Sequence, residues 1–359
     1  MEKVFPRWWN LHEKTEDLDH IPVLDRNVLS FQKQASLFDV FRKAGYAKRE
    51  KRVGWSLVGH GHAYADCGQI KAKGCDNVGR HKNGLVFGRF YKRSCRRKSC
   101  PTCFEAWASH QAERALVRMA SFVCGSGKVQ RVIEGVKRLF AKESARDVHA
   151  NIVLALEKMV GQSVRAKRLR PIHVVLSPSK GFVFDDFSFV RKLVYRIARR
   201  SGVFGGACII HPYRLRCRIC HATIPDYTKA CLKCGDSRFE WFWSPHFHVV
   251  GFGWVHGTKA GYERHGWVVK NLGVRKSVYA TFQYLLSHAG VGAYHTTTWF
   301  GRLAYNVLRH VAVLGVVREL CPLCMAPLRP LKCVRELDRP PPILVESEFY
   351  ASIADWRCY

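Results

Sequence analysis

Two histidines separated by one residue, His246 and His248, have the spacing that most directly suggests chemistry in this chain. They lie in an aromatic and β-branched segment that ends in glycines, a composition typical of a β-strand. Side chains two residues apart leave a strand from the same face, so we predict that the two imidazoles share one divalent metal. Glu240 and His173 are candidates for a third ligand. The alternative is a hydrogen-bonded pair with a structural role.

A tyrosine on a helix predicted over 278–289 could supply a nucleophile beside such a metal. The apolar residues of this segment form one stripe, and Tyr284 lies on the polar face with His288 one turn further on. A metal that polarises a phosphodiester would let the phenolate attack phosphorus and form a phosphotyrosine. Tyr279, about 140° around the helix from Tyr284, is a fallback candidate, as is Tyr294. The alternative is an ordinary surface tyrosine.

Three groups of cysteines have the spacing of zinc knuckles, in which a pair of thiolates is separated by two residues. The first predicts one tetrahedral, structural Zn²⁺ and consists of Cys217, Cys220, Cys231 and Cys234. The second consists of Cys100 and Cys103 with two of Cys67, Cys75 and Cys95. The third consists of Cys321, Cys324 and Cys333, with His310 or Cys358 as the possible fourth ligand. The sequence therefore predicts between one and three zinc ions.

The charge of the chain indicates a polyanionic partner. The 359 residues include 59 Lys and Arg against 28 Asp and Glu, a formal net charge of +31 that zinc thiolates would trim only slightly. The positive electrostatic field of such a chain favours the binding of nucleic acid. No apolar run approaches the ~20 residues that span a bilayer, and the first residues do not resemble a signal peptide. We therefore expect a protein of the host cytoplasm, in which 15 cysteines indicate metal sites rather than disulfides.

The basic residues are concentrated in two segments. Residues 187–225 contain no acid, and 255–317 contain only Glu263. DNA contacts are predicted at Arg191, Lys192, Arg196, Arg199, Arg214, Arg216, Arg275 and Lys276. Binding through such contacts weakens steeply with salt.

The elements that must position these residues follow from hydrophobic periodicity. Helices are predicted over 104–122, 129–140, 148–159, 186–200 and 278–289, and strands over 172–177, 205–211 and 239–252. Their order indicates an α+β fold with an antiparallel sheet. We divide the chain into an N-terminal extension (1–60), a cysteine-containing, largely helical region (61–165), an α+β domain with the zinc insert at 217–234 (166–315), and a Cys- and Pro-rich tail (316–359).

Three segments, taken in order, resemble the motifs of the HUH endonucleases, specifically the rolling-circle replication initiators of archaeal plasmids and viruses. Residues 172–177 resemble their first motif strand, 245–250 the metal-binding motif and 282–288 the nucleophile motif. Residues 205–214 and the Cys-Pro-x-Cys sequence at 100–103 are also similar to this archaeal group. The resemblance covers about residues 170–310.

The resemblance implies an RRM-like palm, Mg²⁺ or Mn²⁺ at the histidine pair, and nicking of single-stranded origin DNA. The enzyme would remain linked to the 5′ phosphate, leave a 3′ hydroxyl for the host polymerase and helicase machinery, and later rejoin ends. The family usually carries a lysine near the tyrosine, where this chain has Ser287 and His288. No phosphate-binding loop of a helicase is present. The alternatives are a non-catalytic zinc-ribbon protein that binds nucleic acid and an HUH transposase.

Overall fold

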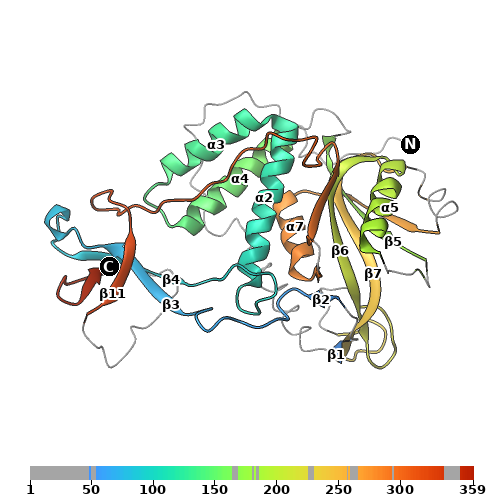
Figure 1. Cartoon of the computed structure of the whole chain (residues 1–359), viewed down its shortest axis with the longest axis horizontal. Coiled ribbons are helices and arrows are strands. Elements are labelled where there is room, and N and C mark those ends of the chain that lie inside the picture. Colours follow the sequence, from blue (N-terminus) through green and yellow to red (C-terminus); the bar gives the residue numbers. More distant parts are fainter. Residues whose placement is uncertain are drawn as a thin grey trace.

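The computed structural model describes an α+β protein built on antiparallel sheets. It describes residues 48–49, 54–163, 169–179, 182, 186–224, 230–256, 258, 266–292, 295–334 and 348–359. Figure 1 shows an elongated molecule with a large sheet at one end, a small sheet at the other and helices between them. None of the helices in these ranges is long and apolar enough to cross a membrane.

The large sheet has the strand order β10-β6-β7-β5-β8, and all of its neighbours in that order are antiparallel. Its strands are β5 (Pro171–Ser177), β6 (Val203–Cys217), β7 (Phe239–Gly253), β8 (Val268–Val274) and β10 (Thr297–Gly301). The short β1 (Lys48–Arg49) pairs in parallel with the first residues of β7. The three predicted strands are confirmed as β5, β6 and β7, whereas β8 and β10 were not predicted.

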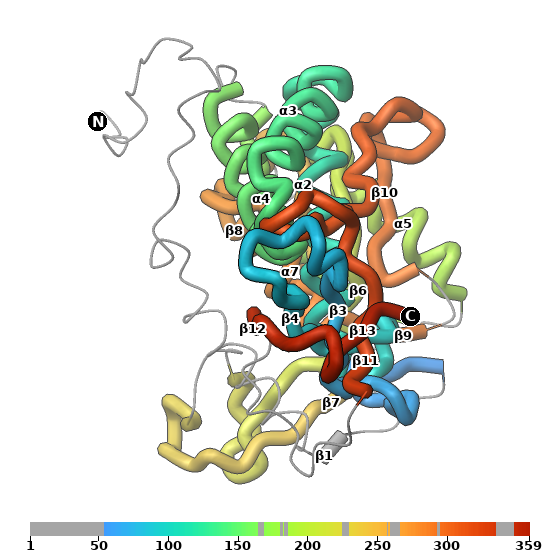
Figure 2. The backbone as a smooth tube through the Cα atoms, turned by 90° about the vertical axis from the view of Figure 1, so that its left-hand side faces the viewer, coloured from blue at the N-terminus to red at the C-terminus, as the bar shows by residue number. Residues whose placement is uncertain are grey.

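Strand β6 is longer than its predicted range because the chain continues through Pro212 to Cys217. The pairing of β6 with β7 shifts register between His211 and Tyr213. Proline has no N–H for the ladder, so such an irregularity is where a strand can accept it. The two 15-residue strands thus form a long hairpin, whose yellow end projects from the rest of the molecule in Figure 2.

One face of the large sheet is covered by α5 (Phe187–Arg200). Val194 and Ile197 of this helix pack with Ile210 and Val249 of the sheet in one buried cluster. The side chain of Asp186 begins the helix by accepting hydrogen bonds from two amides of its first turn.

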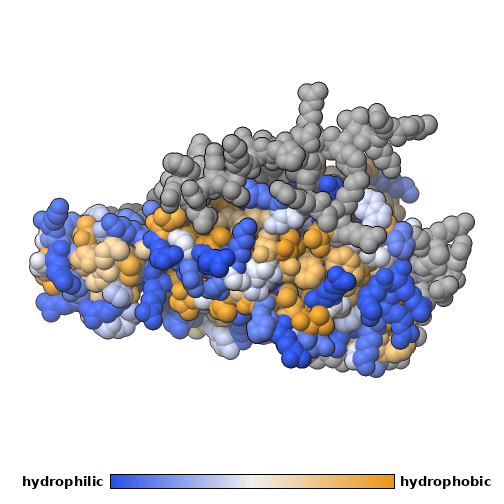
Figure 3. Space-filling view, turned by 90° about the horizontal axis from the view of Figure 1, so that it is seen from above, coloured by the Kyte–Doolittle hydropathy of each residue, from blue (hydrophilic) through white to orange (hydrophobic). Residues whose placement is uncertain are grey.

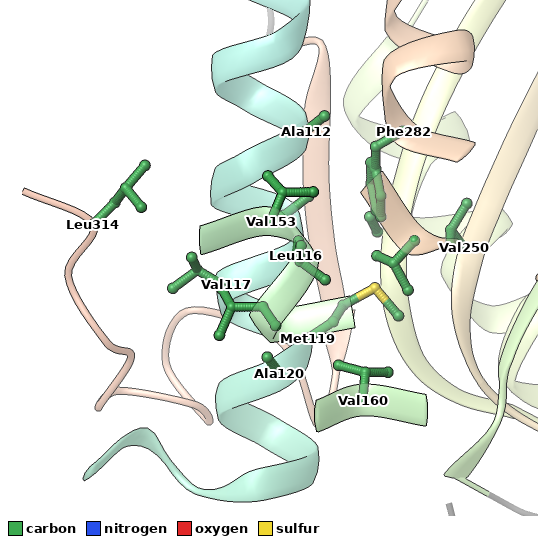
Figure 4. Packing of buried hydrophobic residues seen from close by; sticks show 14 of the residues in the cluster. Ala112, Leu116, Val117, Met119, Ala120, Val153, Val160, Val250, Phe282 and Leu314 are labelled. Carbon is green, nitrogen blue, oxygen red and sulfur yellow. The ribbon is translucent and has the colours of Figure 1, made fainter. Parts of the chain in front are cut away.

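The opposite face is covered by the remaining helices. These are α2 (Phe104–Cys124), α3 (Ser126–Leu139), α4 (Ala145–Gln162) and α7 (Val278–Ser287). All four were predicted, with ends that differ by up to three residues. Figure 4 shows Leu116 and Met119 of α2 beside Val250 of the sheet and Phe282 of α7. Because neighbouring residues of a strand face opposite sides, Val249 and Val250 contact different helical layers.

The small sheet has the order β12-β4-β3-β11-β13 and joins segments that are far apart in the sequence. Its strands are β3 (Ile70–Cys75), β4 (Val86–Lys92), β11 (Arg329–Cys333), β12 (Glu348–Ala351) and β13 (Trp356–Cys358). A short 3₁₀ helix, η3 (Val78–Arg80), lies between β3 and β4. β2 (Ser56–Leu57) and β9 (Gly290–Val291) form a third, two-stranded sheet.

The strands of the small sheet were not predicted, and they connect the cysteine-containing region with the tail.

Seen from above, hydrophilic residues gather over both ends of the molecule, and hydrophobic residues reach the surface between them (Figure 3).

Candidate metal and nucleophile site

Three histidines from the two central strands come together on the sheet face that α7 covers. His211 of β6 lies opposite His246 of β7, and His248 follows two residues along the same strand. Each can offer a ring nitrogen, and these atoms lie within 4.8 Å of one another. All three residues are buried. The predicted common orientation of His246 and His248 is therefore present, and a metal could be held here.

The third imidazole of this group is His211, and neither of the two candidates named from the sequence belongs to the group. Glu240 lies further along β7, where its carboxylate accepts a hydrogen bond from Arg216 at 2.6 Å. His173 of β5 contacts His248 instead, with 2.7 Å between its Nε2 and Nδ1 of His248. Sequence reasoning missed His211 because its position beside the pair depends on the register of β6.

Hydrogen bonds at the second ring nitrogens indicate which atoms face a metal. Nε2 of His211 donates to the carbonyl of Leu285 at 2.9 Å, and because a carbonyl only accepts, this nitrogen carries the proton. Nδ1 of His246 lies 2.9 Å from the carbonyl of Ser244 and 3.3 Å from Nε of Arg214, so the partners of this ring are on its Nδ1 side. The free atoms are Nδ1 of His211 and Nε2 of His246, and contact with His173 likewise leaves Nε2 of His248. Such outer partners are typical of metal-binding histidines.

Burial keeps these imidazoles neutral, which is the form that binds metals. Burial lowers the pKa of His246 to about 3, assisted by the positive charge of Arg214. It lowers the pKa of His173 to about 3 as well, with a smaller contribution from Arg275. The pKa values of His211 and His248 lie well below the usual range for the same reason.

Tyr284 and His288 lie next to the three histidines. The ring of His288 is 4.2 Å from that of His211, and the ring of Tyr284 is 4.9 Å from that of His288, measured between centroids. His288 is buried at the end of α7, and Tyr284 is half-buried. The two residues that the sequence suggested for catalysis therefore continue the cluster by direct ring contacts.

The fallback tyrosines are placed less favourably or lie outside the description. Burial raises the pKa of Tyr279 to about 12, while a hydrogen bond with Ser109 of α2 opposes that shift. The backbone N–H of Tyr279 donates to Glu157 of α4. This tyrosine is thus directed to the helices rather than to the histidines. Tyr294 lies outside the residues that the structure describes.

Two of the predicted DNA-binding arginines flank the histidines. Nη2 of Arg214 donates to the hydroxyl of Ser177 at 2.9 Å, and its Nε lies 3.3 Å from Nδ1 of His246. Burial lowers the pKa of Arg275, and the negative charge of a Tyr284 phenolate would oppose that shift. The Nε of Arg275 is buried with no hydrogen-bond partner among the described residues. The site thus presents positive charge to any group that enters it.

The other predicted DNA contacts lie elsewhere. Four of them are on α5, which covers the opposite face of the sheet: Arg191, Lys192, Arg196 and Arg199. Arg216 pairs with Glu240 and lies over the ring of Phe242. Lys276 is exposed just before α7. The basic residues therefore divide between two faces of the large sheet.

Four predicted cysteines meet at the end of the β6–β7 hairpin. Cys217, Cys220, Cys231 and Cys234 offer sulfur atoms that all lie within 4.8 Å of one another. Cys217 and Cys234 are 3.5 Å apart at sulfur, and Cys220 and Cys231 are 3.4 Å apart. These distances exceed the ~2.05 Å of a disulfide, and the cysteines are free. The group could hold zinc.

The second cysteine group is completed by two of its three candidates. Cys67 and Cys95 join Cys100 and Cys103 within 4.8 Å, at the beginning of α2. Cys75, the remaining candidate, lies at the other end of β3. This group could also hold a metal.

The third group differs from its predicted composition. Cys321 and Cys324 meet Cys75 and His81, again within 4.8 Å. Cys333 belongs to β11, where it pairs with Trp356, and neither it nor the proposed fourth ligands His310 and Cys358 is in the group. The sequence signal that could have indicated Cys75 and His81 as a ligand pair is their separation by six residues.

Comparisons with protein-family models, with curated proteins and with solved structures found no match.

Proposed function

We propose that this protein is a rolling-circle replication initiator of the HUH type, which nicks single-stranded origin DNA and remains attached to it. The observation that carries this proposal is the unbroken set of ring contacts from the three histidines through His288 to Tyr284. We interpret the large antiparallel sheet as the RRM-like palm of such an enzyme. We interpret the cysteine group at the hairpin end as a zinc ribbon.

The residues fit a divalent metal at His211, His246 and His248, because the rings are neutral and their outer nitrogens are hydrogen-bonded. A metal held there would polarise a phosphodiester and stabilise negative charge on its oxygens. Of the two ions named, Mg²⁺ is the poorer match to an all-imidazole set, because it binds oxygen ligands and gives up its waters reluctantly. We therefore expect stronger activity with Mn²⁺.

In the proposed reaction, the phenolate oxygen of Tyr284 attacks phosphorus. The new bond joins the tyrosine to the 5′ phosphate, and the bond from phosphorus to the 3′ oxygen breaks. The 3′ oxygen takes up a proton and leaves as a hydroxyl, whereas the phenol proton passes to His288 or to solvent. Arg275 stabilises the phenolate and Arg214 orients the phosphate, in place of the lysine that related enzymes usually carry. Reversal of the same steps joins two ends.

The experiment is a covalent-adduct assay with the full chain. The probe is a pool of random single-stranded oligonucleotides with a fluorophore at the 3′ end, incubated with Mn²⁺ and resolved by denaturing electrophoresis. Attack on the 5′ phosphate transfers the 3′ label to the protein, whereas a 5′ label stays on the released fragment. We expect Tyr284→Phe to abolish the labelled band and Tyr279→Phe, the matched control, to retain it. An unchanged band with Tyr284→Phe would refute the assignment of the nucleophile.

A second candidate is a zinc-ribbon protein that binds nucleic acid without cutting it. The net charge of +31 and a four-cysteine group at the end of a projecting hairpin favour it. The same assay separates the two: wild-type protein that binds the oligonucleotides in a salt-dependent manner, but never carries a label after denaturation, supports this candidate.

A further inference from the structure

We propose that Cys75, His81, Cys321 and Cys324 bind a structural zinc ion that joins the tail of the chain to the β3–β4 hairpin. The ligands come from two segments about 240 residues apart in the sequence. Cys75 is the last residue of β3 and His81 follows η3, whereas Cys321 and Cys324 precede β11, the strand that pairs with β3. The metal would thus lie where the two segments meet. This inference does not depend on the proposed nicking activity.

The distances within this group fit a tetrahedral zinc site. Nε2 of His81 lies 3.4 Å from the sulfur of Cys321 and 3.3 Å from that of Cys324, and the sulfurs of Cys75 and Cys324 are 3.6 Å apart. Tetrahedral bonds of ~2.3 Å to sulfur and ~2.05 Å to nitrogen place such ligands about 3.6 to 3.8 Å apart. A disulfide would need ~2.05 Å between sulfurs.

The histidine of the group is oriented as a ligand. Its Nδ1 donates to the carbonyl of Leu85 at 2.6 Å, which directs Nε2 of His81 to the sulfurs. His81 is 5% exposed, and Cys75 and Cys321 are buried as well. A buried polar cluster of this kind is stable when its members share a partner such as a metal.

The backbone around Cys321 and Cys324 repeats the form of the two knuckles in the first cysteine group. In segments 217–221, 231–235 and 321–325, the N–H of the last residue donates to the carbonyl of the first cysteine at 3.1, 2.8 and 2.9 Å. The last residue has a left-handed backbone in each, with φ of 55° at His221, 75° at Gly235 and 62° at Met325. Such a conformation is unfavourable for a long side chain such as methionine. Thiolate coordination supplies a reason to retain it.

Besides strand pairing and the ion pairs of Glu319 with Lys73 and Arg89, the small sheet has only a small apolar core. The buried apolar residues of its main cluster are Ala72, Val86, Phe90 and Leu331, with partly buried residues such as Phe349 and Trp356 packed against them. A core of this size is too small to stabilise a sheet alone, and metal binding is a common substitute. We therefore assign the zinc ion the role of fastening residues 319–333 to the hairpin.

The test is the zinc content of the full chain, measured by plasma mass spectrometry and expressed per polypeptide. Relative to wild type, His81→Ala and Cys321→Ser should each lose about one zinc ion. Cys333→Ser is the matched control, because the sequence spacing named Cys333 as a ligand and the structure does not; it should lose none. Loss of a zinc ion from Cys333→Ser together with full retention in His81→Ala would overturn the proposal.

A second measurement covers the case in which these variants do not fold. His81→Cys retains four ligands and converts three sulfurs and one nitrogen into four sulfurs. In protein loaded with ¹¹³Cd, one resonance should move to the region of the four-sulfur sites while the others stay in place. A spectrum identical to that of wild type would contradict the assignment of His81 as a ligand.

Discussion

The third ligand of the proposed metal site can be tested directly by substitution at the histidine cluster. In that proposal Nδ1 of His211 would bind the metal, because its Nε2 donates to Leu285, and His173 would have an outer role, as a hydrogen-bond partner of His248 at 2.7 Å. Glu240 is placed apart from both, paired with Arg216. The structure therefore predicts an order of losses in Mn²⁺ affinity: largest for His211→Ala, intermediate for His173→Ala and negligible for Glu240→Gln.

The magnitudes follow from the roles. Loss of an outer partner weakens metal binding by about 10- to 100-fold, which corresponds to about 1.4–2.7 kcal/mol. We thus expect His173→Ala in that range. His211→Ala would remove one of the three proposed direct bonds, at a residue that is 1% exposed. The loss of Mn²⁺ affinity should then exceed ~100-fold, because the outer-partner effect is the smaller of the two.

Free Mn²⁺ can be counted by electron paramagnetic resonance while the metal is titrated into protein whose cysteine groups are already loaded with zinc. Circular dichroism before each titration checks that the variant is folded. Mn²⁺ binding that is retained by His211→Ala and lost in His173→Ala would show that β5, rather than β6, supplies the third ligand. A loss with Glu240→Gln would show that the site extends along β7.

Three further outcomes are expected. Arg89 is 4% exposed and pairs with Glu319. Arg89→Met should therefore lower the free energy of unfolding, measured by urea denaturation, by about 3 kcal/mol. A change near zero would show that the ion pair does not stabilise the fold. Asp186→Ala removes the cap of α5 and should cost about 1 kcal/mol, measured in the same way, with Asp186→Asn as the neutral control. In the folded protein the pKa values of His173 and His246 are lowered to about 3. As the pH falls below ~6.5, these imidazoles therefore become protonated in the unfolded chain but not in the folded one. The free energy of unfolding should fall by about 1.4 kcal/mol per imidazole for each pH unit in this range. Replacing both histidines with asparagine should flatten that slope relative to wild type, and a parallel slope would contradict the reasoning.

The elements that pack against the central sheet could be predicted because their patterns are local. An apolar stripe on residues 186–200 and another on 278–289 each indicate an amphipathic helix whose apolar face packs against the core. The apolar strands 172–177 and 239–252 indicate a buried sheet. Each of these predictions needed only neighbours in the sequence, and α5, α7, β5 and β7 confirm them.

The small sheet could not be predicted because its strands carry little pattern of their own. Strand β3 reads Ile-Lys-Ala-Lys-Gly-Cys, and β11 reads Arg-Pro-Leu-Lys-Cys. A proline and a glycine in such short segments argue against a strand when they are read alone. Their pairing across some 250 residues, reinforced by Glu319 between Lys73 and Arg89, is a tertiary effect.

The candidate site was predicted in part for the same reason. Residues on one strand or one helix turn, such as His246 with His248 or Tyr284 with His288, are related by the geometry of a single element. His211 is related to them only through the register of two strands. A shift of that register by one residue would turn His211 to the face covered by α5, because side chains alternate along a strand.

The two candidate metal sites along the β6–β7 hairpin are therefore connected through that register. In an ordinary hairpin the turn determines which residues face each other, but here the strands are joined by the segment that contains the four cysteines. Cys217, opposite Phe239, begins that segment, and His211, opposite His246, lies six residues before it in β6. Metal bound by the four thiolates would fix the end of the hairpin and with it the alignment of the histidines. On this reasoning the zinc group contributes to the proposed chemistry through strand register, at a distance from the phosphate that Tyr284 would attack.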